Sequence, residues 1–148
     1  MQITWRECDF SELSVHELYN ALQLRSAVFV LEQQCLYADM DHSDVHARHL
    51  LGSVDGIVLA YARLFAPGQK YEQASIGRVV TAEAYRRTGV GRQLMREAIA
   101  AVERNWGPVS IRIGAQSYLQ KFYESFGFVR DGERYLEDNI PHLPMLRK

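Results

Sequence analysis

Between Arg92 and Arg104, apolar side chains recur every three or four positions, which is the spacing of one face of an α-helix. This apolar face consists of Val90, Leu94, Met95, Ala98, Ile99, Ala101 and Val102. Residues 75–81, shortly before it, are rich in β-branched side chains, and Gly89 and Gly91 lie between the two segments. The pattern therefore predicts a strand, a glycine-containing turn and a long helix at the centre of the fold.

Upstream of this centre, the pattern predicts a short strand at residues 3–6 and a helix that begins after Ser14. Ser14 and Glu17 form the Ser-x-x-Glu capping box that is typical of a helix start. The apolar face of this helix continues as far as Phe29, and a second short helix is expected around residues 30–33. Arg25 lies on or beside this face, which is unusual for an arginine and indicates a partner or a ligand.

Two apolar runs, residues 49–54 and 57–65, follow and are joined by Asp55-Gly56. This dipeptide between apolar runs is a strong signal of a two-residue β-hairpin. A turn at Pro67-Gly68 then leads to the central strand.

After the central helix, Trp106-Gly107-Pro108 interrupts the pattern. A strand is expected at residues 109–113, a short helix at 117–126 that ends at Gly127, and a strand at 128–130. The tail, residues 142–146, contains Pro144. We predict that it is an edge strand, because an edge tolerates the missing N–H of proline.

The predicted order, β-α-α-β-β-β-α-β-α-β-β, indicates the α/β class. A length of 148 residues suits one domain with a real core, spanning residues 1–148. The net charge of −1 leaves no broad basic surface for nucleic acid, and no apolar run is long enough for a membrane span. With no signal peptide and only Cys8 and Cys35, we expect reduced thiols in a cytoplasmic protein.

The turn before the central helix carries the clearest chemical signal. Gly89 and Gly91 leave backbone N–H groups uncovered at the start of a helix, where the helix dipole favours anions. Four arginines surround the turn: Arg86, Arg87, Arg92 and Arg96. The segment therefore predicts a phosphate site, although a solvated basic turn is the alternative interpretation.

Two familiar phosphate loops do not match this turn. A P-loop requires Gly-Lys-Ser/Thr, which does not follow the first glycine. The dinucleotide-binding motif requires a third glycine at the position of Leu94. Arg86-x-x-Gly89-x-Gly91 instead resembles the acyl-CoA pyrophosphate loop of the GNAT (Gcn5-related N-acetyltransferase) superfamily.

A second motif, at the predicted short helix, makes this resemblance specific. Phe122-Tyr123-Glu124-Ser125-Phe126-Gly127-Phe128 resembles the family segment in which a helix ends in Tyr-x-x-Φ-Gly-Phe. The two motifs occur in the family's order, and the element order is also that of GNAT proteins. The flanking segments around residues 24–33, 115–116 and 137–142 look like the ElaA-type branch of bacterial GNAT proteins.

The resemblance implies a mixed, mostly antiparallel sheet of about seven strands, split by the acyl-CoA site and flanked by about four helices. It implies that acetyl-CoA lies against the backbone of Val79 and Val80 and against the loop Arg86, Arg87, Thr88, Gly89, Val90, Gly91 and Arg92. Two departures stand out. Arg87 occupies a position that is more often glycine, and residues 80–86 are about one residue longer than is common, so the bulge that splits the sheet is expected to shift.

The implied activity is transfer of an acetyl group from acetyl-CoA to a primary amine by direct attack in a ternary complex. Tyr123 is the candidate acid that protonates the leaving thiolate, with a core aromatic role as the alternative. Glu32, Asp44, His49 and His142 are candidate bases, each with a structural hydrogen bond as the alternative, and a water relay also stays open. Among them we favour His142, as a base or a substrate ligand.

The acceptor entrance is expected near residues 25–32, 39–49 and 137–142, which are dense in titratable groups. Candidate acceptor residues are Arg25, Glu32, Asp44 and His49, and a small charged amine is the expected acceptor. Residues 39–49 hold three aspartates and three histidines, but their spacing matches no familiar metal site, so we expect no metal. An acetyl-CoA-binding sensor or interaction module without catalysis is the alternative function, and a homodimer stays open.

Overall fold

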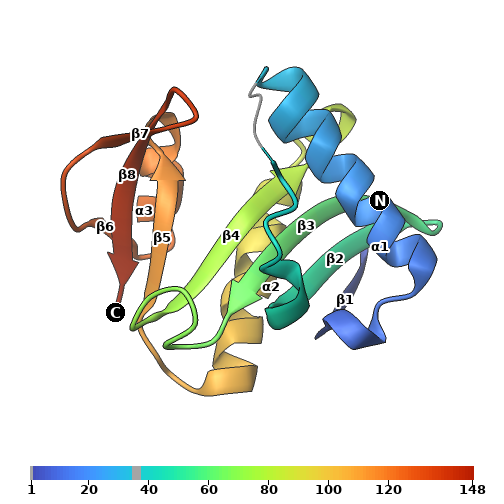
Figure 1. Ribbon diagram of the computed structural model, residues 1–148, viewed down its shortest axis with the longest axis horizontal. Coiled ribbons are helices and arrows are strands. Elements are labelled where there is room, and N and C mark those ends of the chain that lie inside the picture. The colour runs from blue at the N-terminus through green and yellow to red at the C-terminus, as the bar shows by residue number, and fades with distance from the viewer. Residues whose placement is uncertain (1, 35–37) are drawn as a thin grey trace.

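The computed structural model describes residues 2–34 and 38–148, which form one mixed sheet covered by helices on both faces (Figure 1). Of the eight strands in the described residues, seven follow the order β1-β2-β3-β4-β5-β8-β6, and the eighth, β7, pairs with β8. They are β1 (Thr4–Asp9), β2 (Arg48–Val54), β3 (Ile57–Phe65), β4 (Ala74–Thr81), β5 (Ile111–Gln116), β6 (Val129–Arg130), β7 (Tyr135–Glu137) and β8 (Ile140–Arg147). All paired strands are antiparallel except β4 and β5, so the mixed, mostly antiparallel sheet is confirmed.

Three α-helices accompany the sheet: α1 (Val15–Arg25), α2 (Val90–Trp106) and α3 (Gln120–Glu124). The capping box predicted at the start of α1 is present, with Ser14 Oγ accepting from Glu17 N–H at 2.9 Å. The second short helix is a π-helix that continues α1 over Ser26–Glu32. Helices α1 and α2 lie on opposite faces of the sheet in Figure 1, and each packs on its own buried cluster.

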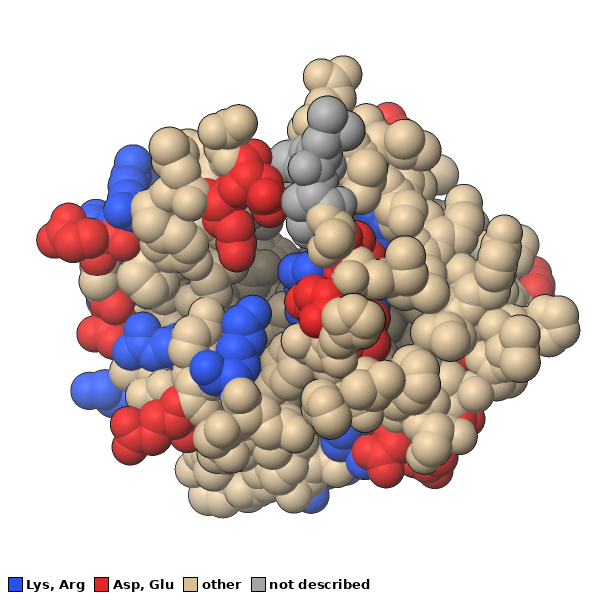
Figure 2. All heavy atoms as spheres, in the orientation of Figure 1, with Lys and Arg blue, Asp and Glu red and all other residues tan. Residues whose placement is uncertain are grey.

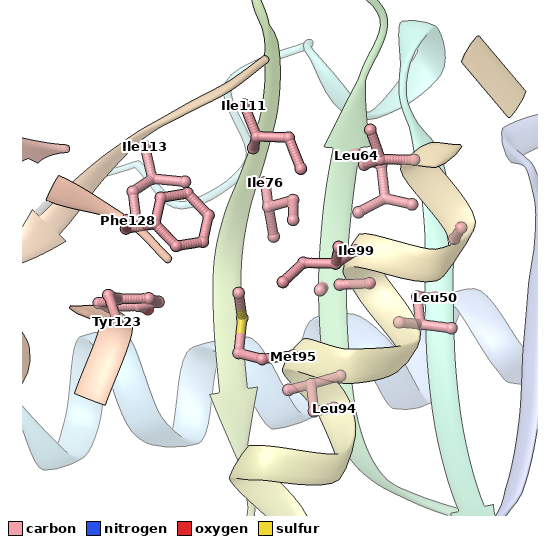
Figure 3. Packing of buried hydrophobic residues seen from close by; sticks show 14 of the residues in the cluster. Leu50, Leu64, Ile76, Leu94, Met95, Ile99, Ile111, Ile113, Tyr123 and Phe128 are labelled. Atoms are coloured by element: carbon pink, nitrogen blue, oxygen red, sulfur yellow. The ribbon is translucent and has the colours of Figure 1, made fainter. Parts of the chain in front are cut away.

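The larger cluster lies between α2 and the sheet, as the apolar spacing predicted. All seven residues of the predicted apolar face of α2 are buried. Figure 3 shows Leu94, Met95 and Ile99 beside Leu50, Leu64 and Ile76 of the strands. Because burying one large aliphatic side chain contributes about 1.5–3 kcal/mol, this contact is what holds α2 and its N-terminal turn in place.

The hairpin and the C-terminal strands show where local signals succeeded and where they failed. Asp55 and Gly56 have φ values of 51° and 78°, as a type I′ hairpin requires, so the predicted hairpin is confirmed. Asp138 and Asn139 join β7 to β8 with similar positive φ values. The first strand of this second hairpin, β7, was not predicted, so the described part of the sheet has eight strands where about seven were expected.

The prediction that the tail is an edge strand is wrong. Strand β8 lies inside the sheet, paired with β5 on one side and with β7 and β6 on the other. Its prolines are tolerated because Pro141 lies beyond the β5 ladder, and Pro144 lies where the second neighbour changes from β7 to β6. The edges of the sheet path are β1 and β6.

The sheet splits between β4 and β5. These strands pair only at Ala74 with Ile111 and at Ser75 with Arg112, and then diverge. In β4 the register against β3 shifts between the pairs Arg63–Gly77 and Tyr61–Val80, and Arg78 has φ 48° within this irregularity. A β-bulge adds twist and bends a strand, so the bulge in β4 turns it away from β5 and opens the site described next.

Candidate functional site

A cleft of about 1120 Å³ lies where β4 and β5 diverge. Its walls come from β4, β5, the π-helix, the turn before α2, α3 and the β7–β8 hairpin. Figure 2 shows a hollow near the middle of the molecule, with acidic side chains above it, basic side chains below it and a mixed charged cluster to its right. The cleft therefore brings together segments from both halves of the chain.

The glycine-containing turn forms one end of this cleft. Gly89 is the N-cap of α2 with φ 86°, and Arg87 has φ 64°. Arg87 thus has a left-handed backbone conformation, which glycine adopts more easily. This conformation explains why the position that Arg87 occupies is more often glycine. No neighbouring heavy atom among the described residues lies within 4 Å of a Cβ built on Gly89, so the backbone of the turn is open to a ligand.

The side chains of the turn have different surroundings. Arg86, Arg87 and Gly91 line the cleft, whereas Val90 is buried in the core beneath it. Thr88 Oγ1 donates to the carbonyl of Tyr85 within the turn. Arg92 lies over the rings of Phe122 and Phe126, at 5.8 and 5.4 Å from their centroids, and donates to Ser125 Oγ at 3.2 Å. Arg92 therefore connects the first motif to the second.

Arg86 and Glu32, predicted respectively for the cofactor and the acceptor, are partners. Arg86 Nη1 and Nη2 donate to the two Glu32 carboxylate oxygens at 2.5 and 2.9 Å. Both side chains are about one-third exposed and both line the cleft. The pair links the π-helix to the glycine-containing turn across the mouth of the cleft.

Tyr123 lies on α3 between the core and the cleft. Its side chain is 7% exposed and contacts Phe122 and Phe128 edge to face, yet it also lines the cleft. Burial raises the pKa of its hydroxyl above the usual range, so Tyr123 holds its proton at neutral pH. Val79 and Val80 of β4 line the same cleft. The candidate acid and the candidate thioester wall thus share one space.

His142 lies on β8, on the opposite side of the cleft from the turn's helix. It is 7% exposed, and its Nδ1–H donates to the Ile140 carbonyl at 2.7 Å. Its Nε2 faces Glu137 Oε2 at 3.3 Å, and its ring stacks on Tyr135 at 5.6 Å between centroids. A carbonyl can only accept, so Nδ1 carries a proton and Nε2 is the nitrogen available for proton transfer.

Tyr135 brings its hydroxyl against β5 at Gly114. A Cβ on Gly114 would overlap that hydroxyl, so glycine is required for this approach. Glu137, Tyr135 and His142 all line the cleft and all come from the β7–β8 hairpin that the hydrophobic pattern missed.

Arg25, Asp44 and His49 do not line the cleft. Arg25 and Asp44 belong to a largely buried ionic network that ends in the exposed Asp41, and His49 lies beneath it. The network consists of Arg25, Asp39, Asp41, Asp44, Arg63 and Arg78. Arg25, 1% exposed, donates to Asp39 and Asp44, each at 2.9 Å, so the partner expected for it is present. Arg63 Nη1 also donates to Asp44, at 3.0 Å.

His49 uses both of its ring nitrogens beneath this network. Nε2 lies 2.9 Å from the Asp44 carbonyl and donates to it, and Nδ1 accepts from the Tyr61 hydroxyl at 2.6 Å. Burial lowers the pKa of His49 and raises that of Tyr61, so both are neutral near pH 7. His49 therefore has a complete set of structural partners.

The aspartates of residues 39–49 are engaged by arginines. Among residues 2–34 and 38–148, no group of three or more His, Cys, Asp or Glu side chains is arranged to hold a metal ion. Cys8 is a free, buried thiol, and Cys35 lies outside the described residues. No described helix has the length and apolarity to cross a bilayer.

Several residues of the cleft were missed by the sequence analysis, notably Arg63, Lys70, Tyr71 and Arg78. Arg63 carried a usable signal, because a charged side chain inside an otherwise apolar strand needs a partner. Lys70 and Tyr71 lie in the connection between β3 and β4, where a local pattern says nothing about which cavity a loop reaches.

Comparisons with known proteins agree with this geometry. The model of the acetyltransferase (GNAT) domain family matches residues 11–148. Protein ElaA of Escherichia coli K12 is 45% identical over 148 residues, covering 99% of this chain and 97% of ElaA. The crystal structure of E. coli ElaA superposes with a TM-score of 0.93 at 44% identity, covering 99% of this chain and 100% of that one.

Two further solved structures are informative. An acyl-CoA N-acyltransferase from Pseudomonas aeruginosa has a TM-score of 0.93 at 44% identity, over 98% of this chain and 99% of that one. The PaiA N-acetyltransferase of Thermoplasma acidophilum, solved in complex with coenzyme A, shares the fold with a TM-score of 0.72 at 16% identity, over 100% of this chain and 99% of that one. The family match over nearly the whole chain, the full-length likeness to ElaA and the two motifs at the split sheet together show that the chain belongs to the GNAT acetyltransferase family.

Proposed function

We propose that this protein transfers an acetyl group from acetyl-CoA to a primary amine by direct attack in a ternary complex. The single observation that carries the proposal is the continuous cleft between β4 and β5, which runs from the open turn at the start of α2 to the His142–Glu137 pair. Such a cleft has room for a donor and an acceptor at the same time, and proximity is a major source of catalysis.

The cofactor end of the cleft fits a pyrophosphate. The open backbone at Gly89, the N-terminus of the 17-residue helix α2 and the side chains of Arg86 and Arg87 are all suited to an anion. The solved coenzyme A complex of the T. acidophilum protein, which shares the fold, supports the choice of coenzyme A. Val79 and Val80 would flank the thioester, and a backbone N–H of this bulged strand would stabilise the oxyanion.

The other end supplies the proton transfers. His142 Nε2 would take the proton that the amine loses as its nitrogen bonds to the acetyl carbon, with Ile140 orienting the ring and Glu137 stabilising the imidazolium. Tyr123 would give its proton to the sulfur as the carbon–sulfur bond breaks, since burial keeps its hydroxyl protonated. The products are an N-acetylated amine and free coenzyme A.

A two-part experiment tests this function. Acetyl-CoA should raise the melting temperature of the wild-type protein, and Gly89→Val should remove the rise by blocking the backbone. A panel of amines should then release coenzyme A, and Tyr123→Phe should lower turnover about 10²–10⁴-fold with acetyl-CoA binding intact. Binding without turnover of any amine would favour a sensor or interaction module, and an absent melting shift would reject both.

A further inference from the structure

Lys70 is a cation of the cleft that has no carboxylate partner. Its side chain is exposed, lies between β3 and β4, and lines both the main cleft and an adjoining hollow of about 270 Å³. Its Nζ lies over the rings of Phe65 and Tyr71, at 5.8 and 5.7 Å from their centroids. Among residues 2–34 and 38–148 no carboxylate lies within ion-pair distance of it, and the sequence has no acidic side chain outside that range.

The charges around Lys70 leave an excess of positive charge. Three carboxylates, Asp39, Asp41 and Asp44, are shared among Arg25, Arg63 and Arg78. Lys70 is a fourth cation beside them, and burial together with the charges of Arg63 and Arg78 lowers its pKa. Arg63 Nε is buried and has no hydrogen-bond partner among the described residues, so one donor of this cluster also lacks an acceptor.

The facing wall of the cleft carries the opposite charge. Burial, Arg63 and Arg78 lower the pKa of Lys70, whereas Glu137 is near enough for its carboxylate to raise it, as Asp41 also does. The same Glu137 lies 3.3 Å from His142 Nε2, the nitrogen assigned to proton transfer. Figure 2 shows acidic side chains above the hollow and basic side chains below it. The acceptor end thus offers an anion beside the base and an unpaired cation across from it.

We propose that the acceptor is an amine that also carries a carboxylate, such as an amino acid, and that Lys70 binds this carboxylate while Glu137 and His142 receive the amine. This inference rests on the proposed function and names its substrate class. The carboxylate would supply the negative charge that Lys70 lacks, since Asp39, Asp41 and Asp44 already match the charges of the three arginines beside it. A polyamine would place a further cation beside Lys70, which like-charge repulsion disfavours.

The test compares amines that differ only in the carboxylate. Binding to the coenzyme A-loaded protein is measured by calorimetry for three pairs: L-phenylalanine and phenethylamine, 4-aminobutyrate and propylamine, and L-lysine and cadaverine. The variants are Lys70→Met, which removes the charge, and Lys121→Met, a matched control at another exposed lysine, which does not line the cleft. Acetyl-CoA binding is measured first for every variant.

In at least one pair, the carboxylate-bearing member should bind the wild-type protein about 10–100-fold more tightly than its partner, as expected for a hydrogen bond to a charged group. Lys70→Met should abolish this difference, whereas Lys121→Met should keep it, and acetyl-CoA affinity should be the same in all three proteins. Absence of binding by every carboxylate-bearing member, equal binding within every pair, or an unchanged difference in Lys70→Met would overturn the inference. A wild-type protein that does not bind acetyl-CoA would instead reject the proposed function.

Discussion

His49 and His142 stand in two regions that looked equivalent in the sequence, since both lie in polar stretches crowded with titratable groups. In the structure they differ in what remains available. The His49 region is closed, because both ring nitrogens and all three nearby aspartates have protein partners. The His142 region is open, because Nε2 and Glu137 line the cleft. The density of charged residues alone therefore does not distinguish a structural ion-pair network from a candidate reaction site. What distinguishes them is whether the titratable side chains already have protein partners.

Removing the imidazole of the open region should have the largest effect. His142→Ala should lower turnover about 10²–10⁴-fold, as loss of a general base does, while acetyl-CoA still binds. Steady-state kinetics with an acceptor found in the amine panel measures the change, and urea unfolding of the same variant is the control for folding. Wild-type turnover in this variant would assign the base to another group or to water.

Breaking the closed region should affect folding rather than chemistry. Asp44→Ala leaves Arg25 and Arg63 without a shared carboxylate, and removal of one partner from a buried ion pair costs about 3–5 kcal/mol. The free energy of unfolding, from urea titration, should fall by about that amount. If Asp44→Ala keeps its stability and loses acceptor turnover, the two regions have been assigned the wrong way round.

The closed region should also make stability depend on pH. His49 has a lowered pKa in the folded state, so the unfolded chain binds its proton more readily, and stability falls as pH decreases below about 6.5. One such proton contributes at most about 1.4 kcal/mol per pH unit. Unfolding at pH 7 and pH 5 measures the difference.

His49→Gln, which cannot titrate, should show a smaller fall over this range than the wild type. Below about pH 4 a second fall is expected in both proteins. Burial opposes the ionisation of Asp41 and Asp44, but their arginine partners outweigh it and lower the pKa of both carboxyl groups. The partners are Arg63 and Arg78 for Asp41, and Arg25 and Arg63 for Asp44. Stability is therefore lost as these carboxylates take up protons at low pH. An identical profile for His49→Gln above pH 5 would remove His49 from this account.

The smallest effect is expected at the pair that bridges the mouth of the cleft. Glu32→Gln removes the carboxylate that holds Arg86, and a part-exposed ion pair of this kind is worth about 0.2–1 kcal/mol. If that attraction competes with the pyrophosphate, acetyl-CoA affinity should rise about 1.5–5-fold. Calorimetric titration measures it, with Glu97→Gln, a half-buried residue of α2 that does not line the cleft, as the control. A weaker affinity in Glu32→Gln would mean that Glu32 positions Arg86 for the cofactor instead.

Local chemistry was sufficient for the features that depend on neighbours in sequence. The apolar face of α2, the Ser14–Glu17 capping box and the Asp55-Gly56 hairpin could all be predicted, because each rests on contacts within a few residues. The turn at Arg86–Gly91 belongs to the same group, since its backbone conformation follows from its glycines and from the helix that begins there. These features were sufficient to indicate the family and the proposed cofactor end of the site.

Tertiary structure decided the surroundings of the proposed acceptor end. The incorrect prediction that β8 is an edge strand rested on its prolines, which do favour sheet edges. Inside this sheet, Pro144 is tolerated because it lies where the neighbour of β8 changes from β7 to β6. Arg25 pairs with residues 14 and 19 positions away, and Arg78 reaches Asp39 across 39 positions, so no local pattern could show that Asp44 is engaged while Glu137 faces the cleft. The sequence by itself determined which residues carry charge and where the helices start. Long-range pairing determined which charges are neutralised inside the protein and which, like that of the exposed Lys70, line the cleft without a carboxylate partner, because contacts between distant segments exist only in the packed chain.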